Sequence, residues 1–343
     1  MDSKPRSIHI DALRGLAVLL MVLVHAAATW EPPLSGNAML LGIVVSAGGG
    51  LAAPLFVALL GWGLFQRQLS GKQRVWRAGW LFACQLAVNL SAPHLFEPWT
   101  PGVLSLMGLL ILSEAWWGRW WRHSSAPSRT FSGVVVLVLL FTLVFESLQG
   151  PSNWEARTSS AGVAEWINHL VITGLYPFIP WAVFAALGIT IASLQGEHRR
   201  IVLLRRLSGV GFVVSLGVLI DAWQNQKAWA LPTGEASLTF FPANAPFIVA
   251  ALTGTALLWW LAEKTGAFTP LSNLGRVSLT VYVLHFFPMT LFHSVDEVYS
   301  LSSTLTSLLV VAYTLGWTVF GSWLYHRIPH LTLEALMKRQ EPS

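Results

Sequence analysis

Charged residues are scarce in this 343-residue chain, and cysteine is almost missing. Asp, Glu, Lys and Arg make up 11% of the residues and hydrophobic residues 54%, whereas soluble domains carry about 25% charged residues. Together with a mean hydropathy of +0.58, this excludes an ordinary soluble protein and predicts a polytopic membrane protein. The single cysteine, Cys84, lies in an apolar stretch, so no intrachain disulfide can form and a small buried hydrophobe is expected.

Motifs for metals and nucleotides are also lacking. The sequence has no Cys-x-x-Cys pair and its ten histidines are spread along the chain, so no metal is expected. It contains no P-loop, no dinucleotide fingerprint and no Gly-x-Ser-x-Gly elbow. The formal charge of +5 does not indicate a nucleic-acid partner, because the basic residues fall in short loops between apolar segments.

Apolar segments of about 20 residues predict ten transmembrane helices around a central cavity, in one domain covering residues 1–343. The segments are 11–29, 38–65, 76–91, 101–118, 131–148, 174–194, 203–222, 243–262, 274–294 and 304–325. With a cytoplasmic N-terminus, all but Arg157 and Lys227 of the 21 Lys and Arg residues fall on the inner side. This bias predicts the orientation and puts both termini in the cytoplasm.

The first apolar segment carries Asp11, Arg14 and His25. It is too long and too charged for a cleavable signal peptide, so an uncleaved anchor is expected. Eleven helical steps bring Arg14 and His25 to one face, about 16 Å apart along the axis. Ionisable groups inside a span are costly and are candidates for a functional site. The structural alternatives are an Asp11–Arg14 ion pair and a histidine satisfied by packing.

Further arginines are expected near the cytoplasmic surface. Arg74 and Arg77 enter the third predicted helix and Arg276 enters the ninth. Guanidinium groups bind phosphate in a bidentate manner, so these residues and Arg14, with Asp11 beside it, are candidates for holding a polyphosphate donor. The alternative for Arg74 and Arg77 is the ordinary excess of basic residues on the inner side.

His25, nearer the outer side, is the leading candidate for a general base, because a neutral imidazole can take a proton from an attacking hydroxyl or amine. Asn89, Tyr282 and His285 could orient it or stabilise a developing oxyanion. Tyr282 and His285 are three residues apart and share a helix face. Each of the three could instead serve packing or an interhelical hydrogen bond.

The spacing of Arg14 and His25 suggests a mechanism. About 16 Å is comparable to the length of an extended pantetheine arm. A coenzyme A thioester with its phosphates near Arg14 could therefore present its acyl carbon near His25. Acyl transfer across the membrane follows, with a donor from the cytosol and an acceptor from the outer side.

Several of these segments resemble the transmembrane acyltransferase superfamily. The segment Asp11–His25 is similar to the first-helix signature of the acyltransferase family 3 branch, in which ten residues separate Arg from His. Arg74-x-x-Arg77 resembles its cytoplasmic Arg-x-x-Arg motif. Residues 274–285, LGRVSLTVYVLH, resemble its late-helix Leu-Trp-His-x-Pro segment, with Leu284 in place of Trp and Pro288 one position late.

Two internal segments resemble the heparan-α-glucosaminide N-acetyltransferase-like branch. Residues 101–109, PGVLSLMGL, are similar to its PGVLQRIGL segment, with Ser105-Leu106 in place of Gln-Arg. Residues 176–184, YPFIPWAVF, resemble its Tyr-Pro-Phe-Phe-Pro-Trp segment. The resemblance implies a ten-helix membrane acyltransferase that uses acetyl-CoA or another acyl-CoA, a sugar or glycolipid-like acceptor, and His25 as base.

The expected function is therefore acyl-CoA-dependent O- or N-acyl transfer to a sugar, glycoconjugate or other small acceptor, in the bacterial cytoplasmic (inner) membrane in contact with lipid. A transporter of a small polar solute, and a non-enzymatic protein that binds coenzyme A or lipid, are the alternatives. The sequence leaves open the acceptor, the acyl chain, the oligomeric state (a homodimer included) and whether an acyl-histidine forms.

Overall fold

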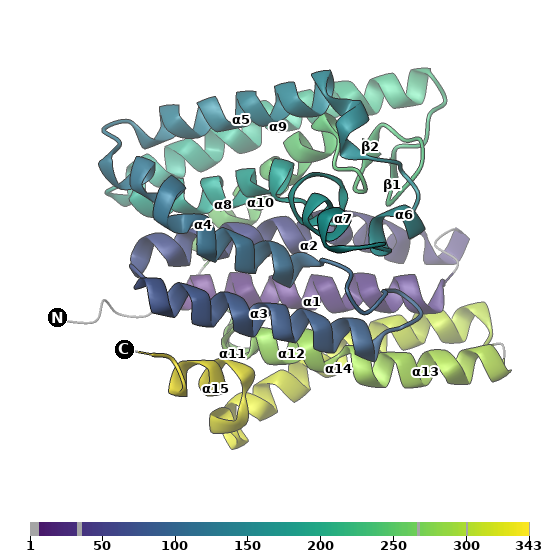
Figure 1. Ribbon diagram of the computed structural model, residues 1–343. Coiled ribbons are helices and arrows are strands. Elements are labelled where there is room, and N and C mark those ends of the chain that lie inside the picture. The colour runs from purple at the N-terminus through teal and green to yellow at the C-terminus, as the bar shows by residue number, and fades with distance from the viewer. Residues whose placement is uncertain (1–6, 33–35, 266–267, 300, 343) are drawn as a thin grey trace. The chain divides into compact units, whose positions relative to one another are not determined.

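The computed structural model describes residues 7–32, 36–265, 268–299 and 301–342. Residues 1–6, with the predicted inner-side residues Lys4 and Arg6, lie outside these ranges. Within them the regular structure is helical apart from one parallel pair of two-residue strands, β1 (Ala230–Leu231) and β2 (Leu238–Thr239) (Figure 1). The predicted class, an all-α polytopic membrane protein, is confirmed.

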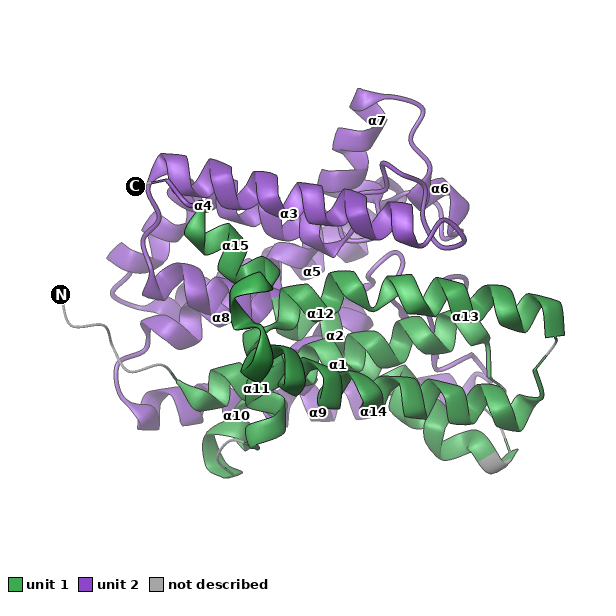
Figure 2. Ribbon diagram, turned by 90° about the horizontal axis from the view of Figure 1, so that it is seen from below, with its two compact units in different colours: residues 1–56, 258–340 green, residues 57–257, 341–343 purple. Residues whose placement is uncertain are grey.

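The chain forms two compact units (Figure 2). Unit 1 comprises residues 1–56 and 258–340, and unit 2 comprises residues 57–257 and 341–343. The chain passes between them three times: inside two helices, α2 (Met39–Gln66) and α10 (Ala245–Thr265), and again between Gln340 and Glu341. A single functional domain across residues 1–343 stays a prediction.

Unit 1 is arranged around α1 (Ile8–Trp30) (Figure 1). The apolar residues of this helix are largely buried. This helix packs against four helices from the C-terminal part of unit 1: α11 (Thr269–Arg276), α12 (Ser278–Leu284), α13 (Phe286–Tyr299) and α14 (Ser303–Arg327). The backbones of α1 and α11 touch at two glycines, because a Cβ on Gly15 would overlap the Leu271 carbonyl and one on Gly275 the Asp11 carbonyl. Glycine there allows the close approach on which the polar contacts below depend.

The predicted ninth helix, 274–294, is divided in the structure into the end of α11, α12 and α13. The chain leaves helical geometry at Val277, and His285 lies between α12 and α13. Pro288 has no N–H for the Leu284 carbonyl and its ring crowds that turn, which accounts for the second break. After α14 come a short 3₁₀ turn, η4 (Pro329–Leu331), and α15 (Leu333–Arg339).

Unit 2 contains five longer helices and a set of short ones. Its longer helices, besides the parts of α2 and α10, are α3 (Gly71–Ser91), α4 (Val103–His123), α5 (Pro127–Val144), α8 (Phe178–Ser193) and α9 (Glu197–Gln224). Its short elements are η2 (Glu146–Gln149), α6 (Glu155–Thr158), α7 (Val163–Asn168) and η3 (His169–Thr173). Helix α4 packs on both α3 and α8, and α8 also packs on α5.

Buried Arg157 ties the short elements of unit 2 together. Its guanidinium donates to the carbonyls of Gln149, Gly150, Thr173 and Gly174 at 2.7–3.2 Å. The side chain is 1% exposed. Arg157, one of the two predicted outer-side cations, therefore organises the backbone of the segment between α5 and α8.

Seven helical spans of the described residues are long and apolar enough to cross a membrane, or eight if a bent pair (Val163–Thr173 with Phe178–Ser193, 48°) counts as one. The seven are α1, α2, α5, α9, α10, α12 with α13, and α14. Helices α3 and α4, at the third and fourth predicted segments, each have 21 residues but are not among them. Both carry several charged residues, so the predicted count of ten spans is not confirmed.

Candidate active site

Two histidines from distant parts of unit 1 meet between α1 and α12. His25 Nδ1 lies 2.9 Å from His285 Nε2. The rings are parallel within 3°, with centroids 5.2 Å apart. His285 is fully buried and His25 is partly exposed. The sequence predicted both as site residues, and the structure brings them into direct contact.

The hydrogen bonds assign the protons of this pair. His285 Nδ1 lies 3.2 Å from the Val281 carbonyl oxygen, which can only accept, so this nitrogen carries the proton. In neutral His285 the other nitrogen, Nε2, is then an acceptor, and His25 Nδ1 donates to it. With both rings neutral, the lone pair of His25 is on Nε2. In this arrangement, His25 Nε2 is the ring nitrogen without a proton.

Aromatic residues of α12, α13 and α14 surround the pair. Tyr282, another predicted site residue, has its ring centroid 6.3 Å from His25 and 5.9 Å from His285. Phe286 packs against both histidines. The Tyr313 hydroxyl of α14 donates a hydrogen bond to the His285 carbonyl oxygen. The backbone hydrogen bond from Met289 N to the same oxygen is long, at 3.4 Å. These contacts hold His285 from its backbone side.

Near the start of α1, the buried carboxylate of Asp11 lies between two arginines. Its Oδ1 is 3.2 Å from Arg14 Nη1 and its Oδ2 is 3.3 Å from Arg276 Nε. Asp11 is 1% exposed, whereas the side chains of Arg14 and Arg276 are 31% and 27% exposed. Arg276 also donates to the Tyr325 hydroxyl and lies over that ring, 4.9 Å from its centroid. Three predicted residues therefore form one cluster with a net charge of +1.

The histidine pair and the Asp11 cluster share the same packing partners. Asp11 and His25 belong to α1, while Arg276 and His285 border α12 at its two ends. Arg14 and His25 are eleven residues apart in a continuous helix, which corresponds to about 16 Å on one face. The two groups of polar residues therefore occupy two levels of the same helix contact in unit 1.

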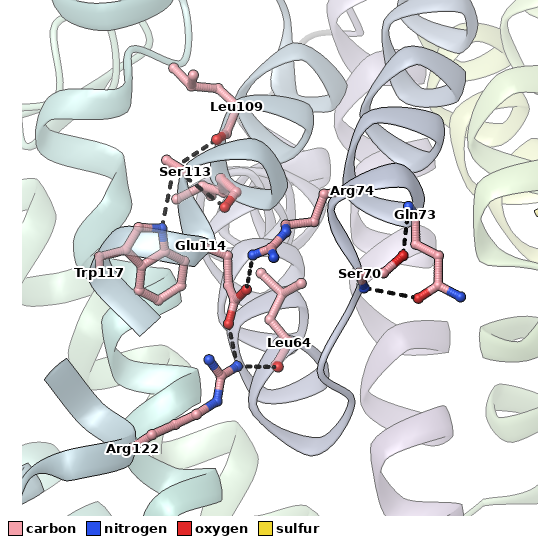
Figure 3. A network of polar contacts seen from close by, with 10 residues as sticks. Leu64, Ser70, Gln73, Arg74, Leu109, Ser113, Glu114, Trp117 and Arg122 are labelled. Carbon is pink, nitrogen blue, oxygen red and sulfur yellow. Dashed lines mark hydrogen bonds and ion pairs between the residues drawn. The ribbon is translucent and has the colours of Figure 1, made fainter. Parts of the chain in front are cut away.

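Arg74 and Arg77 belong to unit 2, and each is paired with a carboxylate. Arg74 Nη1 lies 3.2 Å from Glu114 Oε2, and Arg122 donates to the other oxygen of Glu114 and to the Leu64 carbonyl (Figure 3). Arg77 contacts Glu341. The ion pair of Arg74 joins α3 to α4, which the sequence analysis did not anticipate.

Asn89 is engaged in the backbone of unit 2. Its amide donates to the carbonyls of Pro98 and Thr100 at 2.9 and 2.8 Å, and its oxygen accepts from Gln85 at 2.8 Å. Gln85 in turn accepts from Leu104 N. These bonds hold the loop between α3 and α4, and they favour the structural alternative for Asn89.

Sequence reasoning missed several members of these networks. Glu114 and Arg122 had a recognisable signal, since an acid inside an apolar segment calls for a partner and Gly118 between them leaves room. A Cβ on Gly118 would lie 2.6 Å from Glu114 Oε1 and 3.3 Å from Arg122 Nη1. Tyr313 and Tyr325 had no such signal, because only the packing of α14 brings them to His285 and Arg276.

No metal site is formed by the part of the chain described here, in which no group of three or more His, Cys, Asp and Glu side chains could hold an ion. His326 and His330 are four residues apart, but α14 ends at Arg327, so they do not share a helix face.

Comparison with protein families covers both halves of the chain. Residues 6–219 match the family heparan-alpha-glucosaminide N-acetyltransferase, catalytic. The chain belongs to this family. This heparan-α-glucosaminide N-acetyltransferase family member also matches, at residues 189–339, a family described as protein of unknown function (DUF418). No curated protein matches the chain.

Membership confirms the family predicted from the sequence motifs and supports an acetyltransferase-type function in a membrane. The apolar helices identify an integral membrane protein. The first match includes Arg14, His25, Arg74, Arg77 and Asn89. Tyr282, His285 and Arg276 fall in the second matched region, so the histidine pair joins residues from both.

Proposed function

We propose that this protein transfers an acetyl or other acyl group from cytosolic acyl-CoA to a hydroxyl or amine of an acceptor on the outer side of a bacterial cytoplasmic membrane. A sugar or glycoconjugate is the proposed acceptor. The single observation that carries the proposal is the contact of 2.9 Å between His25 Nδ1 and His285 Nε2. It leaves His25 Nε2 as the basic nitrogen of a partly exposed ring.

In the proposed reaction, His25 Nε2 takes the proton of the attacking hydroxyl or amine. The acceptor atom forms a new bond to the acyl carbon, the thioester C–S bond breaks, and the thiolate of coenzyme A receives the proton from the His25 imidazolium. Throughout the reaction, His285 Nε2 accepts the hydrogen bond from His25 Nδ1–H, and this bond orients the His25 ring. Tyr282 borders the pair, and its hydroxyl is the candidate donor to the developing oxyanion.

The diphosphate of the donor is assigned to Arg14 and Arg276. Their side chains are 31% and 27% exposed and share the one carboxylate of Asp11, so the cluster has a net positive charge that an anion can reach. Asp11 orients the two arginines. The distance of about 16 Å between the levels of Arg14 and His25 suits a pantetheine arm extended along α1.

The test is acyl transfer by purified protein in lipid nanodiscs, followed by release of coenzyme A and by mass spectrometry of amino-sugar and glycolipid acceptors. His25→Ala should lower the rate by about 10²–10⁴-fold, the usual contribution of a general base, and should leave donor binding unchanged. His198→Gln, at an exposed position near the start of α9, is the matched control. Wild-type turnover by His25→Ala would exclude the proposed base.

His285 allows a finer test because its role depends on one acceptor atom. His285→Gln offers an amide oxygen to His25 Nδ1 and should retain part of the activity, whereas His285→Leu cannot accept and should lose more. A shifted pH profile of kcat should accompany both substitutions, because His285 acts through His25. Solute uptake into proteoliposomes without an acyl product would instead support the transporter alternative.

A further inference from the structure

An ion-pair cluster in unit 2 has the composition of a phosphate site. Arg77 contacts Glu341 in a fork, with Nε 2.7 Å from Oε1 and Nη2 3.1 Å from Oε2. Arg67 Nη2 lies 3.1 Å from the same Oε2. The side chain of Glu341 is 5% exposed, whereas those of Arg67 and Arg77 are 50% and 22% exposed. Two guanidiniums thus enclose one carboxylate and still reach solvent.

Arg67 and Arg77 lie on either side of the start of α3: Arg67 in the turn after α2, and Arg77 within α3 itself. Arg67 directly follows α2 and bonds back to Gly63 O through its backbone N–H. Ser70 and Gln73 form a capping box at the start of α3 (Figure 3), and such boxes satisfy two free backbone donors at once. Backbone hydrogen bonds therefore position the segments that carry the two arginines. Their partner Glu341 belongs to a distant segment, which follows α15.

The charges of this cluster do not cancel. Arg67 and Arg77 carry two positive charges and Glu341 supplies one negative charge. The hydrogen bond from Arg77 holds the pKa of the Glu341 carboxyl below its usual value, so the group is ionised at neutral pH. A phosphate monoester carries about −1.5 to −2 charges at pH 7 and accepts the same forked hydrogen bonds as a carboxylate. Such a phosphate would neutralise the two arginines more completely than Glu341 does.

We propose that Arg67 and Arg77 form a phosphate-binding site and that Glu341 is its internal ligand, which a phosphate group must displace. The phosphate is a monoester, and it belongs either to coenzyme A in the acyl donor or to a lipid headgroup such as that of phosphatidic acid. Where it belongs to the donor, the inference rests on the proposed function. Glu341 then acts as an autoinhibitory contact that sets the apparent affinity of the site.

Calorimetric titration of the full chain in phosphatidylcholine nanodiscs tests the inference. Glu341→Gln should bind coenzyme A more tightly by on the order of three- to tenfold, the range expected when the two partly exposed ion pairs of one competing carboxylate are removed. Arg77→Gln should weaken binding, and the gain should vanish in Glu341→Gln/Arg77→Gln. Glu197→Gln removes the same charge from an exposed position at the start of α9 and is the control.

Two further measurements distinguish the sources of the phosphate. Dephospho-coenzyme A lacks the phosphate monoester. If that monoester occupies the site, wild type and Glu341→Gln should bind dephospho-coenzyme A with the same affinity. Native mass spectrometry in mixed nanodiscs counts bound phosphatidic acid, whose headgroup is a phosphate monoester, and a gain confined to this lipid identifies a headgroup. Either gain supports the inference. The inference is overturned if wild type and Glu341→Gln bind coenzyme A equally well and also bind the lipid equally well. It is also overturned if the gain in affinity from Glu341→Gln persists when Arg77→Gln is added.

These binding measurements need no acceptor and no turnover, so the two proposals fail separately. Loss of the proposed transferase activity would leave a Glu341-dependent phosphate site intact. Conversely, transfer that depends on His25 while phosphate binding ignores Glu341 would overturn only this inference. Hydrogen exchange provides a second readout, because displacement of Glu341 should increase exchange in the residues that follow α15.

Discussion

Asp11 in unit 1 and Glu114 in unit 2 are both buried carboxylates between two arginines, yet their surroundings differ. The arginines around Asp11 are 31% and 27% exposed, with distances of 3.2 and 3.3 Å. Those around Glu114, Arg74 and Arg122, are 20% and 18% exposed. Asp11 therefore lies in a more open cluster and Glu114 in a more enclosed one.

The remaining donors of the arginines extend this difference. Arg122 also donates to the Leu64 carbonyl, so the Glu114 cluster ties α3 and α4 to the end of α2 (Figure 3). Arg276 also uses a second donor, on the Tyr325 hydroxyl, but the side chains of Arg14 and Arg276 are more exposed than those of Arg74 and Arg122. The comparison teaches that an arginine in a matching sequence motif is not by itself a ligand site, because the use of its other donors decides its role.

The largest effect is expected when each carboxylate is removed. Glu114→Ala leaves two poorly exposed guanidiniums unpaired, and breaking a buried pair from one side costs about 3–5 kcal/mol. Asp11→Ala should cost less, because its arginines can turn toward water. Thermal unfolding in detergent, with Glu146→Ala at an exposed position as control, measures both. A larger loss for Asp11→Ala would reverse the comparison.

A smaller effect separates the arginines themselves. Arg14→Gln should weaken binding of coenzyme A by about tenfold, equivalent to ~1.4 kcal/mol, with little change in melting temperature. Arg74→Gln should lower the melting temperature and leave the affinity nearly unchanged, because Arg74 serves the α3–α4 contact. Calorimetry and thermal unfolding of the same preparations test both. If Arg74→Gln alone weakens binding, Arg74 rather than Arg14 belongs to the donor site.

The smallest effect concerns two glutamates outside the spans. Glu334 of α15 accepts from the backbone N–H groups of Leu279 and Thr280 and from the Thr280 hydroxyl, yet burial raises its pKa above 4.5. The folded protein then binds more protons than the unfolded chain just above pH 4.5, so stability falls as pH rises through that window.

Glu341 behaves in the opposite way, because Arg77 lowers its pKa. Its contribution to the stability of the fold is present above pH 4.5 and is lost as pH falls below it.

Thermal unfolding between pH 3.5 and 8 measures these opposite slopes. In wild type, Glu334 makes stability fall as pH rises above 4.5, and this fall should be absent in Glu334→Gln. Glu341 makes stability fall as pH drops below 4.5, and that fall should be absent in Glu341→Gln. Identical pH profiles for the two variants would show that their environments do not differ as described.

Much of the fold was predictable because apolar length is a local property. Helices occur at all ten predicted segments, and the first, Ile8–Trp30, closely matches the predicted 11–29. The count of spans was harder, since α3 and α4 combine helical length with charges that only their packing in unit 2 accommodates. The division of the ninth segment at Val277 and His285 was also missed, although Pro288 was a signal for the second break.

The candidate site was predictable in part for the same reason. His25, Tyr282 and His285 were identified as polar residues within apolar segments, and the Asp11–Arg14 pair, weighed as a structural alternative, does form. Their distances were not predictable, because 260 residues separate the two histidines. The carboxylate partners of Arg74 and Arg77 were missed, since Glu114 and Glu341 are 40 and 264 residues away from them.

The amino-acid sequence by itself determined the membrane class, the positions of the helices, the family and which ionisable residues lie within or beside apolar segments. These follow from composition and from spacing along one helix. Only the tertiary structure decided that His25 meets His285, that Asp11 joins Arg14 to Arg276, and that Glu114 and Glu341 engage the other arginines. The physical reason is that hydrogen bonds and ion pairs act over about 3 Å, and packing alone brings side chains from distant segments within that range.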